Sequence, residues 1–231
     1  MKTFRAKTGP FTERPYYSDE EIETVCNDEL RALSLLPDSP APIRIDRFIE
    51  KRFVVPQYED LEEGILGLTT FGPNGVKEII VSRSLEEEGT VSARRRVRTT
   101  LAHEGGHGLF HTHLFALDRA SKPLFGDFSD PSAPKVLCRD EAASAGGYKG
   151  EWWEFQANKA ISALLMPRFL VHAAITEFME PAGLLAIPTF DHSRLANAVD
   201  HLSEVFDVNP IVAKIRVQQL FPALDSRQLT L

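Results

Sequence analysis

Two histidines and a glutamate are spaced in a way that suits metal-dependent hydrolysis. The run His103-Glu104-Gly105-Gly106-His107 has the form H-E-x-x-H and falls within a segment typical of a helix. Residues four apart on a helix share a face, so both imidazoles can reach one metal ion. Glu104 then lies beside the ion without binding it and can accept a proton from water. The pattern predicts a zinc hydrolase site; two unrelated histidines on a surface helix are the alternative.

The predicted motif helix, from about Val91 to Leu114, is rich in glycine. Gly105, Gly106 and Gly108 lie within it. Each costs roughly 1 kcal/mol relative to alanine in a helix interior. We therefore expect a compensating interaction, either metal ligation or a close approach by another backbone or a substrate. Ordinary packing against a neighbouring element is the alternative.

A zinc site with two histidines needs a third protein ligand from another element. The best candidate segment is a second predicted helix over residues 151–167, ended by its proline. Glu154 and Asn158 lie four apart on one face of it. Glu154 can bind the metal, while the Asn158 amide oxygen can accept the free N–H of a ligand histidine. Glu151 lies on nearly the same face, but a favourable interaction with the helix dipole explains it better.

The elements that must position these residues can be read from the periodicity of the chain. A capping box at Ser18 to Glu21 precedes apolar residues at helical spacing, and two β-rich runs flank a Gly-Pro-Asn-Gly turn. Near the C-terminus, apolar residues with a short break predict two helices joined by a tight turn, as in a helix-turn-helix. The predicted elements are helices over 19–36 and 43–52, a hairpin of strands over 64–71 and 76–81, and two helices within 200–220.

The overall charge limits the classes of partner. The chain has 231 residues and a formal net charge of −7, which argues against broad binding to nucleic acid or anionic membranes. The N-terminus lacks the apolar run of a secretory signal, and the apolar stretch 169–188 is broken by charges and proline. The sequence predicts a cytoplasmic protein that does not span a membrane.

Basic residues are clustered in only one place, at Arg94, Arg95, Arg96 and Arg98. We interpret this cluster as a solvated helix face, with steering of an acidic substrate or contact with nucleic acid as the alternative. The second C-terminal helix offers only Lys214 and Arg216 as basic residues. It is therefore expected to be a packing or substrate-docking element, and direct nucleic-acid binding is not expected.

Two strings of residues are similar to those of a known family. The string Leu-Ala-His-Glu-Gly-Gly-His over 101–107, followed by Glu154-x-x-Ala157-Asn158 and by Leu-Leu-Met-Pro over 164–167, resembles the ImmA/IrrE family of zinc metallo-endopeptidases. The resemblance covers about residues 40 to 222. It implies an α+β, zincin-like (gluzincin-type) fold, with a small twisted sheet packed on the H-E-x-x-H helix and a helical C-terminal region. The implied organisation is an N-terminal helical extension over 1–40, a metallopeptidase domain over 41–180 and a helix-turn-helix-like region over 181–231.

The resemblance also implies a role for each motif residue. His103, His107 and Glu154 would bind Zn²⁺, Glu104 would be the general base, and Asn158 would support a ligand histidine. Known members of the family cleave helix-turn-helix repressors, so such a repressor is the expected partner. One departure is Gly105, where the family has a bulky apolar residue, and it predicts a more open wall beside Glu104.

Several roles stay open at this level. The donor that stabilises the oxyanion is unassigned: Tyr148 is one candidate, and His111, His113, His172 and His192 are others. A surface or hydrogen-bonded role is the alternative for each. His111 continues the i, i+4 series from His107. Because three ligands are already assigned and catalytic zinc needs an open position, we expect His111 to lie beyond reach of the metal, with a side chain that points toward the site as the alternative. A noncatalytic DNA- or protein-binding regulator with a structural or vestigial metal site is the competing hypothesis. The sequence leaves the oligomeric state open.

Overall fold

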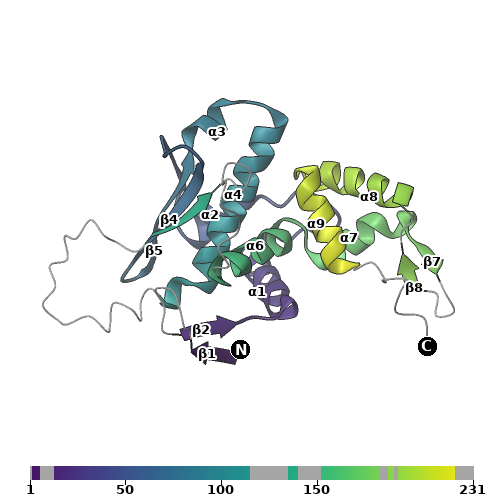
Figure 1. Cartoon of the computed structure of the whole chain (residues 1–231), viewed down its shortest axis with the longest axis horizontal. Coiled ribbons are helices and arrows are strands. Elements are labelled where there is room, and N and C mark those ends of the chain that lie inside the picture. Colours follow the sequence, from purple (N-terminus) through teal and green to yellow (C-terminus); the bar gives the residue numbers. More distant parts are fainter. Residues whose placement is uncertain are drawn as a thin grey trace, which may run out of the picture.

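The computed structural model describes residues 2–5, 13–114, 135–139, 152–182, 187–189 and 192–221. Within these ranges the chain is a mixed α+β protein with a four-stranded sheet and two small two-stranded sheets (Figure 1). The helices are α1 (Asp19–Ala32), α2 (Ile45–Arg52), α3 (Arg83–Glu87), α4 (Val91–Phe110), α6 (Trp152–Leu165), α7 (Arg168–Ile175), the short 3-10 helix η1 (Thr176–Phe178), α8 (His192–Val205) and α9 (Pro210–Leu220). The strands are β1 (Lys2–Arg5), β2 (Glu13–Tyr16), β3 (Gln57–Glu59), β4 (Ile65–Gly72), β5 (Gly75–Ser82), β6 (Lys135–Arg139), β7 (Glu180–Ala182) and β8 (Ile187–Thr189).

Helix α1 begins where the capping box predicted. The Ser18 hydroxyl accepts a hydrogen bond from the Glu21 amide, and the Glu21 carboxylate accepts one from the Ser18 amide. The helix ends at Ala32, four residues before the predicted end, and Ser34 follows in the left-handed region with φ 56°. Its apolar face is buried in the same core as α4 and α6. The N-terminal region was predicted to be a helical extension. It also contains the strand pair β1–β2, which precedes α1 and was not predicted.

The predicted hairpin is confirmed as β4 and β5, which pair antiparallel. Pro73 and Asn74 form the turn between Gly72 and Gly75, and Gly75 has φ +117°, a conformation that favours glycine. Strand β3 pairs parallel with β5, and β6 pairs antiparallel with β4, which gives the order β3-β5-β4-β6. The sheet thus extends the predicted hairpin by one strand on each side.

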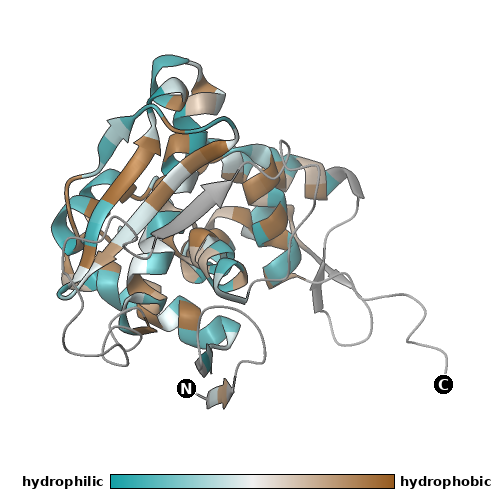
Figure 2. Ribbon diagram, turned by 60° about the vertical axis from the view of Figure 1, so that its left-hand side comes forward, coloured by the Kyte–Doolittle hydropathy of each residue, from teal (hydrophilic) through white to brown (hydrophobic). Residues whose placement is uncertain are grey.

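Helix α4 lies between this sheet and α6, and the C-terminal helices α7, α8 and α9 lie beyond α6 (Figure 1). Figure 2 shows hydrophobic residues along β4 and β5 and on the helix segments that face the interior. Every residue of α4 from Thr100 to Gly108 is buried. A helix enclosed on all sides needs small residues wherever neighbours come close. This position explains why the motif helix has no single apolar stripe.

Gly106 is the point of closest approach between α4 and α6. A Cβ atom there would lie 2.9 Å from Ala160 Cβ, 3.1 Å from Ala157 Cα and 3.2 Å from the Ala157 carbonyl oxygen. The last two atoms belong to the backbone, so no side-chain rotation can relieve the contact. The expected close approach of another backbone is therefore found at this glycine, and it brings the two helices near enough to share a metal site.

The arginine cluster of α4 is partly bound internally: the prediction of a solvated face is wrong for Arg95 and Arg98, whereas the Arg94 side chain is 62% exposed. Arg94 and Arg95 donate hydrogen bonds to the Asp207 carboxylate at 3.1 and 3.0 Å, and Arg98 donates to the Asp207 carbonyl at 2.9 Å. The Arg95 and Arg98 side chains are only 17% and 15% exposed. Partial burial opposes ionisation of Asp207, but the hydrogen bonds from Arg95 and Arg94 and the charge of Arg98 lower its pKa. Asp207 lies in the turn between α8 and α9, so the cluster fixes that turn to α4.

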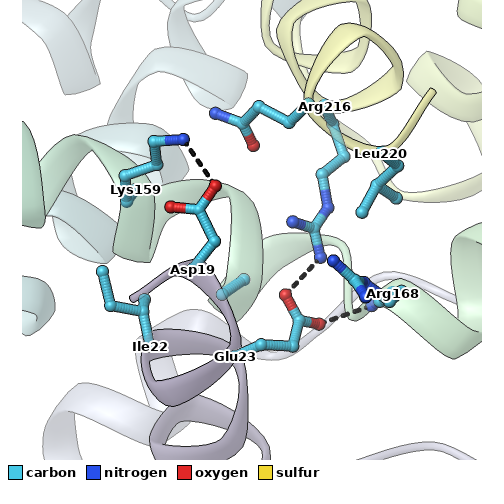
Figure 3. A pocket seen from close by; sticks show the side chains of 9 residues that line it. Asp19, Ile22, Glu23, Lys159, Arg168, Arg216 and Leu220 are labelled. Atoms are coloured by element: carbon cyan, nitrogen blue, oxygen red, sulfur yellow. Dashed lines mark hydrogen bonds and ion pairs between the residues drawn. The ribbon is translucent and has the colours of Figure 1, made fainter. Parts of the chain in front are cut away.

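Helix α9 is held by a second buried ion pair (Figure 3). Arg216, with only 4% exposure, pairs with Glu23 at 2.7 Å and donates to the Met166 carbonyl at 2.9 Å. The second Glu23 oxygen accepts from the Arg168 amide at 2.6 Å. The two predicted C-terminal helices are present as α8 and α9, although α8 begins at His192, before the predicted segment 200–220. Arg216, one of the two basic residues of α9, thus binds α1 and the end of α6. These contacts hold α9 against the rest of the fold.

Among the described residues, no single helix is both long and apolar enough to cross a membrane. The bent pair formed by α6 and 168–178 passes the same length and composition criteria only when its two helices are taken together.

Candidate metal centre

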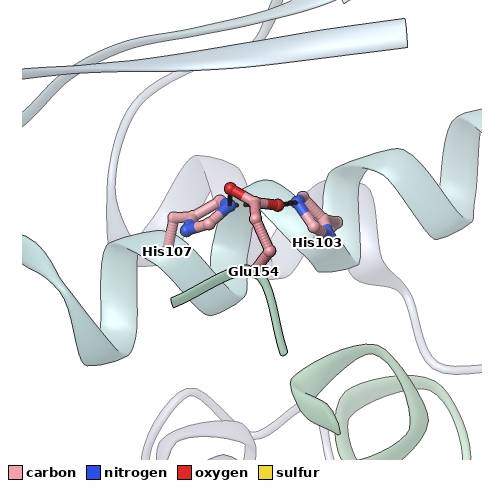
Figure 4. Close-up of side chains that lie close together, drawn as sticks. All are labelled: His103, His107 and Glu154. Carbon is pink, nitrogen blue, oxygen red and sulfur yellow. Dashed lines mark hydrogen bonds and ion pairs between the residues drawn. The ribbon is translucent and has the colours of Figure 1, made fainter. Parts of the chain in front are cut away.

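Helices α4 and α6 bring three possible metal ligands together (Figure 4). The Nε2 atoms of His103 and His107 lie 2.9 Å apart, and the Glu154 carboxylate lies 3.1 Å from the first and 3.5 Å from the second. One ligand atom from each residue lies within 4.8 Å of the others. Both histidines are buried, and the Glu154 side chain is 19% exposed. The group predicted from the motif spacing is therefore compact and enclosed by two helices.

Asn158 sets the orientation of His103. The Nδ1 atom of His103 lies 3.1 Å from the Asn158 amide oxygen. An amide oxygen only accepts hydrogen bonds, so Nδ1 carries a proton, and Nε2, the nitrogen available to a metal, faces Glu154 and His107. Asn158 thus occupies the supporting position that the sequence predicted.

His107 is supported by a different set of residues. Its Nδ1 atom lies 2.9 Å from Nδ1 of His111, whose Nε2 atom lies 3.0 Å from the Gln156 amide oxygen. The Gln156 amide nitrogen donates to the Pro15 carbonyl of β2 at 2.8 Å. His111 is not among the three grouped ligands, but it contacts one of them. The sequence predicted that His111 lies beyond reach of the metal, and it is indeed outside the ligand group, but its contact with His107 and the role of Gln156 were missed.

Strand β4 positions Glu104, the residue between the two histidines. Glu104 is fully buried, and one of its carboxylate oxygens accepts a hydrogen bond from the Thr69 hydroxyl at 2.5 Å. The other oxygen, Oε1, has no hydrogen-bond partner among the described residues. Gly67 lies on the same face of β4, and a Cβ there would lie 2.6 Å from Thr100 Cγ2 and 3.0 Å from Glu104 Oε1. Gly67 and Thr69 were not predicted; their period-two spacing on a strand was the only signal.

Gly105 does not open a wall beside Glu104, and that expectation is wrong. A Cβ atom at this position would lie 2.9 Å from Ile49 Cδ1, 3.6 Å from the Phe48 ring and 3.7 Å from Leu164 Cδ1. Gly105 therefore faces the hydrophobic core on the side of α2. The glycine accommodates packing between helices, and the space beside Glu104 is set by β4 instead.

The ionisable groups of the site are strongly coupled. Burial raises the pKa of Glu104 to about 7, while His103 and the Thr69 hydrogen bond act in the opposite direction. Burial likewise opposes ionisation of Glu154, but hydrogen bonds with both histidines outweigh it and lower its pKa. Burial lowers the pKa of His107. In His103 burial acts in the same direction, but the hydrogen bond to Glu154 and the charges of Glu104 and Glu154 together outweigh it and raise the pKa. Without metal, a His103–Glu154 ion pair therefore holds the centre of the site together.

The donor set fits a bound metal ion. Two imidazole nitrogens and one carboxylate oxygen form a set found in metal hydrolases, and it leaves a coordination position for water. Two Nε2 lone pairs 2.9 Å apart repel each other unless a proton or a cation lies between them. A divalent cation would also offset the charge of two carboxylates, Glu104 and Glu154, in an enclosed site. The residues present are thus suited to hold a metal.

The remaining candidates either lie outside the described residues or are exposed away from the ligand group. Tyr148 and Glu151 lie outside the described residues, as does the side chain of His192. His113 is exposed two residues beyond His111, and His172 is exposed on α7. The oxyanion donor is therefore not assigned to any described residue.

No family model matches the chain, and no curated protein matches it in sequence. The ImmA/IrrE resemblance therefore depends on the motif residues and their spacing. The geometry of those residues is the independent observation that bears on it.

Proposed function

We propose that the chain is a zinc-dependent endopeptidase of the ImmA/IrrE type. The observation that carries the proposal is the convergence of His103, His107 and Glu154 from two helices, with Glu104 held beside them by a strand. A purely structural metal site has no need of a buried, unligated carboxylate next to its ligands. The ligand set of two histidines and a glutamate is that of a gluzincin.

The arrangement of elements supports a zincin-like fold. The motif helix α4 packs against a four-stranded sheet on one side and against α6 on the other. Strand β4 provides the residues next to Glu104, and α6 provides the third ligand. The small sheet, the motif helix and the helix bearing the glutamate thus have the relation that the resemblance implies.

The side chains of the site can be given chemical roles. Zinc, when bound by His103, His107 and Glu154, would act as a Lewis acid and lower the pKa of water to about 7. Thr69 holds one Glu104 oxygen, which leaves Oε1 free to take a proton from the attacking water. The protonated carboxyl can then deliver that proton to the leaving amine. Its burial keeps bulk water from competing for the transfer.

The proposed substrate is a helix-turn-helix repressor. This class follows from the resemblance, in which known members act on such regulators. The arginines that sequence reasoning considered for nucleic-acid contact are largely engaged with Asp207. That arrangement favours a protein substrate over a direct role on DNA.

Metal removal tests the proposed function directly. The purified chain should bind one zinc ion and cleave a purified helix-turn-helix repressor from the same organism. A chelator should abolish cleavage, and added zinc should restore it, because the three ligands act only through the metal. Cleavage followed by gel and mass spectrometry, with zinc measured by elemental analysis, provides the readout. Cleavage that persists without metal, or a chain that binds no zinc, would overturn the proposal.

Loss of the Thr69 hydroxyl should impair the reaction without removing the metal. Thr69→Val removes a hydrogen bond to a charged group, worth about 1.5 kcal/mol or more, so kcat/KM for the repressor should fall about 10-fold. Thr69→Ser keeps the hydroxyl and should stay near wild type. Thr70→Val is the matched control, because Thr70 donates to Glu78 at 3.0 Å and not to Glu104. Equal losses in both valine variants would indicate a general effect on the sheet.

A further inference from the structure

We infer that His111 and Gln156 form a hydrogen-bonded relay that fixes the tautomer of His107 and fastens the metal site to the N-terminal strand pair. The inference rests on the metal site of the proposed function. It assigns roles to two residues that the motif does not contain. The relay runs from the Pro15 carbonyl through Gln156 and His111 to His107, and all four residues are buried.

The direction of the relay is set at its far end. The Pro15 carbonyl can only accept, so the Gln156 atom 2.8 Å from it must be the amide nitrogen. The other Gln156 atom is therefore the amide oxygen, which can only accept. It follows that His111 Nε2, 3.0 Å from that oxygen, carries a proton and donates it.

The near end of the relay follows from the same reasoning. With its proton on Nε2, neutral His111 presents a lone pair at Nδ1. The His107 Nδ1 atom, 2.9 Å away, must then be the donor. His107 is left with an unprotonated Nε2, the atom that lies 2.9 Å from His103 Nε2 and faces Glu154. The opposite polarity would place a proton where the metal must bind.

The two ligand histidines are thus supported in different ways. The Nδ1 atom of His103 is held by one residue of α6, Asn158. His107 depends on two residues in series and on a carbonyl 141 positions away from Gln156 in the sequence. The Arg14 guanidinium also lies over the Trp152 ring at 6.0 Å, and that ring packs edge-on against His111 at 5.8 Å. The strand pair β1–β2 therefore braces the relay as well as ending it.

Zinc affinity of four variants tests the relay. His111→Phe keeps a ring but removes the acceptor, so zinc affinity measured by chelator competition should fall about 10- to 100-fold. His111→Asn places an amide oxygen near the position of Nδ1 and should recover most of that loss. Gln156→Leu should weaken binding by about 10-fold. The exposed neighbour His113 provides the control, and His113→Asn should bind zinc as wild type does.

The double variant separates a relay from general destabilisation. If Gln156 acts only through His111, then Gln156→Leu should cause no further loss in the His111→Phe background. Nitrogen-15 NMR of the metal-free chain gives a second readout. His107 should carry its proton on Nδ1 in wild type and shift toward Nε2 in His111→Phe. In His111→Asn, His107 should keep the wild-type tautomer in the same NMR measurement. Circular dichroism checks that each variant folds.

The outcomes distinguish the relay from the proposed function. Wild-type zinc affinity in His111→Phe, additive losses in the double variant, or a wild-type His107 proton on Nε2 would each overturn the relay while leaving the peptidase proposal intact. If the wild-type chain binds zinc and the variants behave as the relay predicts, but no repressor is cleaved, the relay stands and the proposed function is overturned. A wild-type chain that binds no zinc would overturn both.

Discussion

Replacing Glu104 by glutamine should lower the rate of repressor cleavage by about 10²- to 10⁴-fold, the usual contribution of a general base, while zinc content stays at the wild-type level. Glutamine has the size of glutamate and can still accept the Thr69 hydrogen bond, so the packing around β4 should be kept. It cannot take a proton from water. Single-turnover cleavage of the repressor, with zinc quantified in the same sample, measures both effects.

The control for this variant is a partly exposed carboxylate outside the site that accepts the same kind of hydrogen bond. Glu78 on β5 accepts a hydrogen bond from Thr70 at 3.0 Å, as Glu104 does from Thr69. Glu78→Gln should leave cleavage unchanged. Wild-type cleavage by Glu104→Gln would remove the general base from the mechanism. Loss of zinc in Glu104→Gln would instead make Glu104 a determinant of metal binding.

The elements that carry the ligands could be predicted because their signals are local. The spacing of His103 and His107 fixes their shared face on α4, and the spacing of Glu154 and Asn158 does the same on α6. The capping box at Ser18 and the turn before Gly75 likewise depend on a few adjacent residues. Each of these predictions needed only the geometry of one helix or one turn.

The residues that were missed act across long distances in the chain. Thr69 and Gly67 contribute to the site only because β4 packs on α4, 35 positions away for the Thr69 hydrogen bond. Gln156 matters through Pro15, on a short strand whose proline argues against a strand in the sequence. Strands β3 and β6 are short, and their pairing depends on the hairpin already being present. No local pattern contains this information.

The two wrong expectations share a physical cause. In both cases the surroundings of a residue were inferred from its own type and its near neighbours in the sequence. The actual surroundings depend on which distant segment packs against it. The arginine cluster was assigned to solvent because the acidic run 86–88 just upstream offsets its charge, but the left-handed residue Asp207 brings a carboxylate to it from a distant segment. Gly105 was assigned to the site wall because it follows Glu104, but consecutive helix positions point in different directions, and Gly105 faces Ile49. In both cases the neighbour comes from a distant segment.

Replacing Glu154 by alanine should weaken zinc binding more than any change to a supporting residue. The Glu154 carboxylate is the only acidic member of the ligand group and contacts both histidines, at 3.1 and 3.5 Å. Its removal leaves two neutral donors, which should not retain zinc against a chelator. Asn158→Ala, which removes only the partner of His103, should cost about 10- to 100-fold in affinity.

The order of these two affinities is the decisive measurement. Competition with a chromophoric chelator should rank wild type above Asn158→Ala, and Asn158→Ala above Glu154→Ala. Glu20→Ala, an exposed carboxylate on α1, should match wild type. If Glu154→Ala binds zinc as tightly as Asn158→Ala or better, Glu154 is not a ligand, and the third donor must be sought elsewhere. Glu154 and Asn158 both lie on α6, so that result would mean that α6 positions His103 through Asn158 but provides no metal ligand.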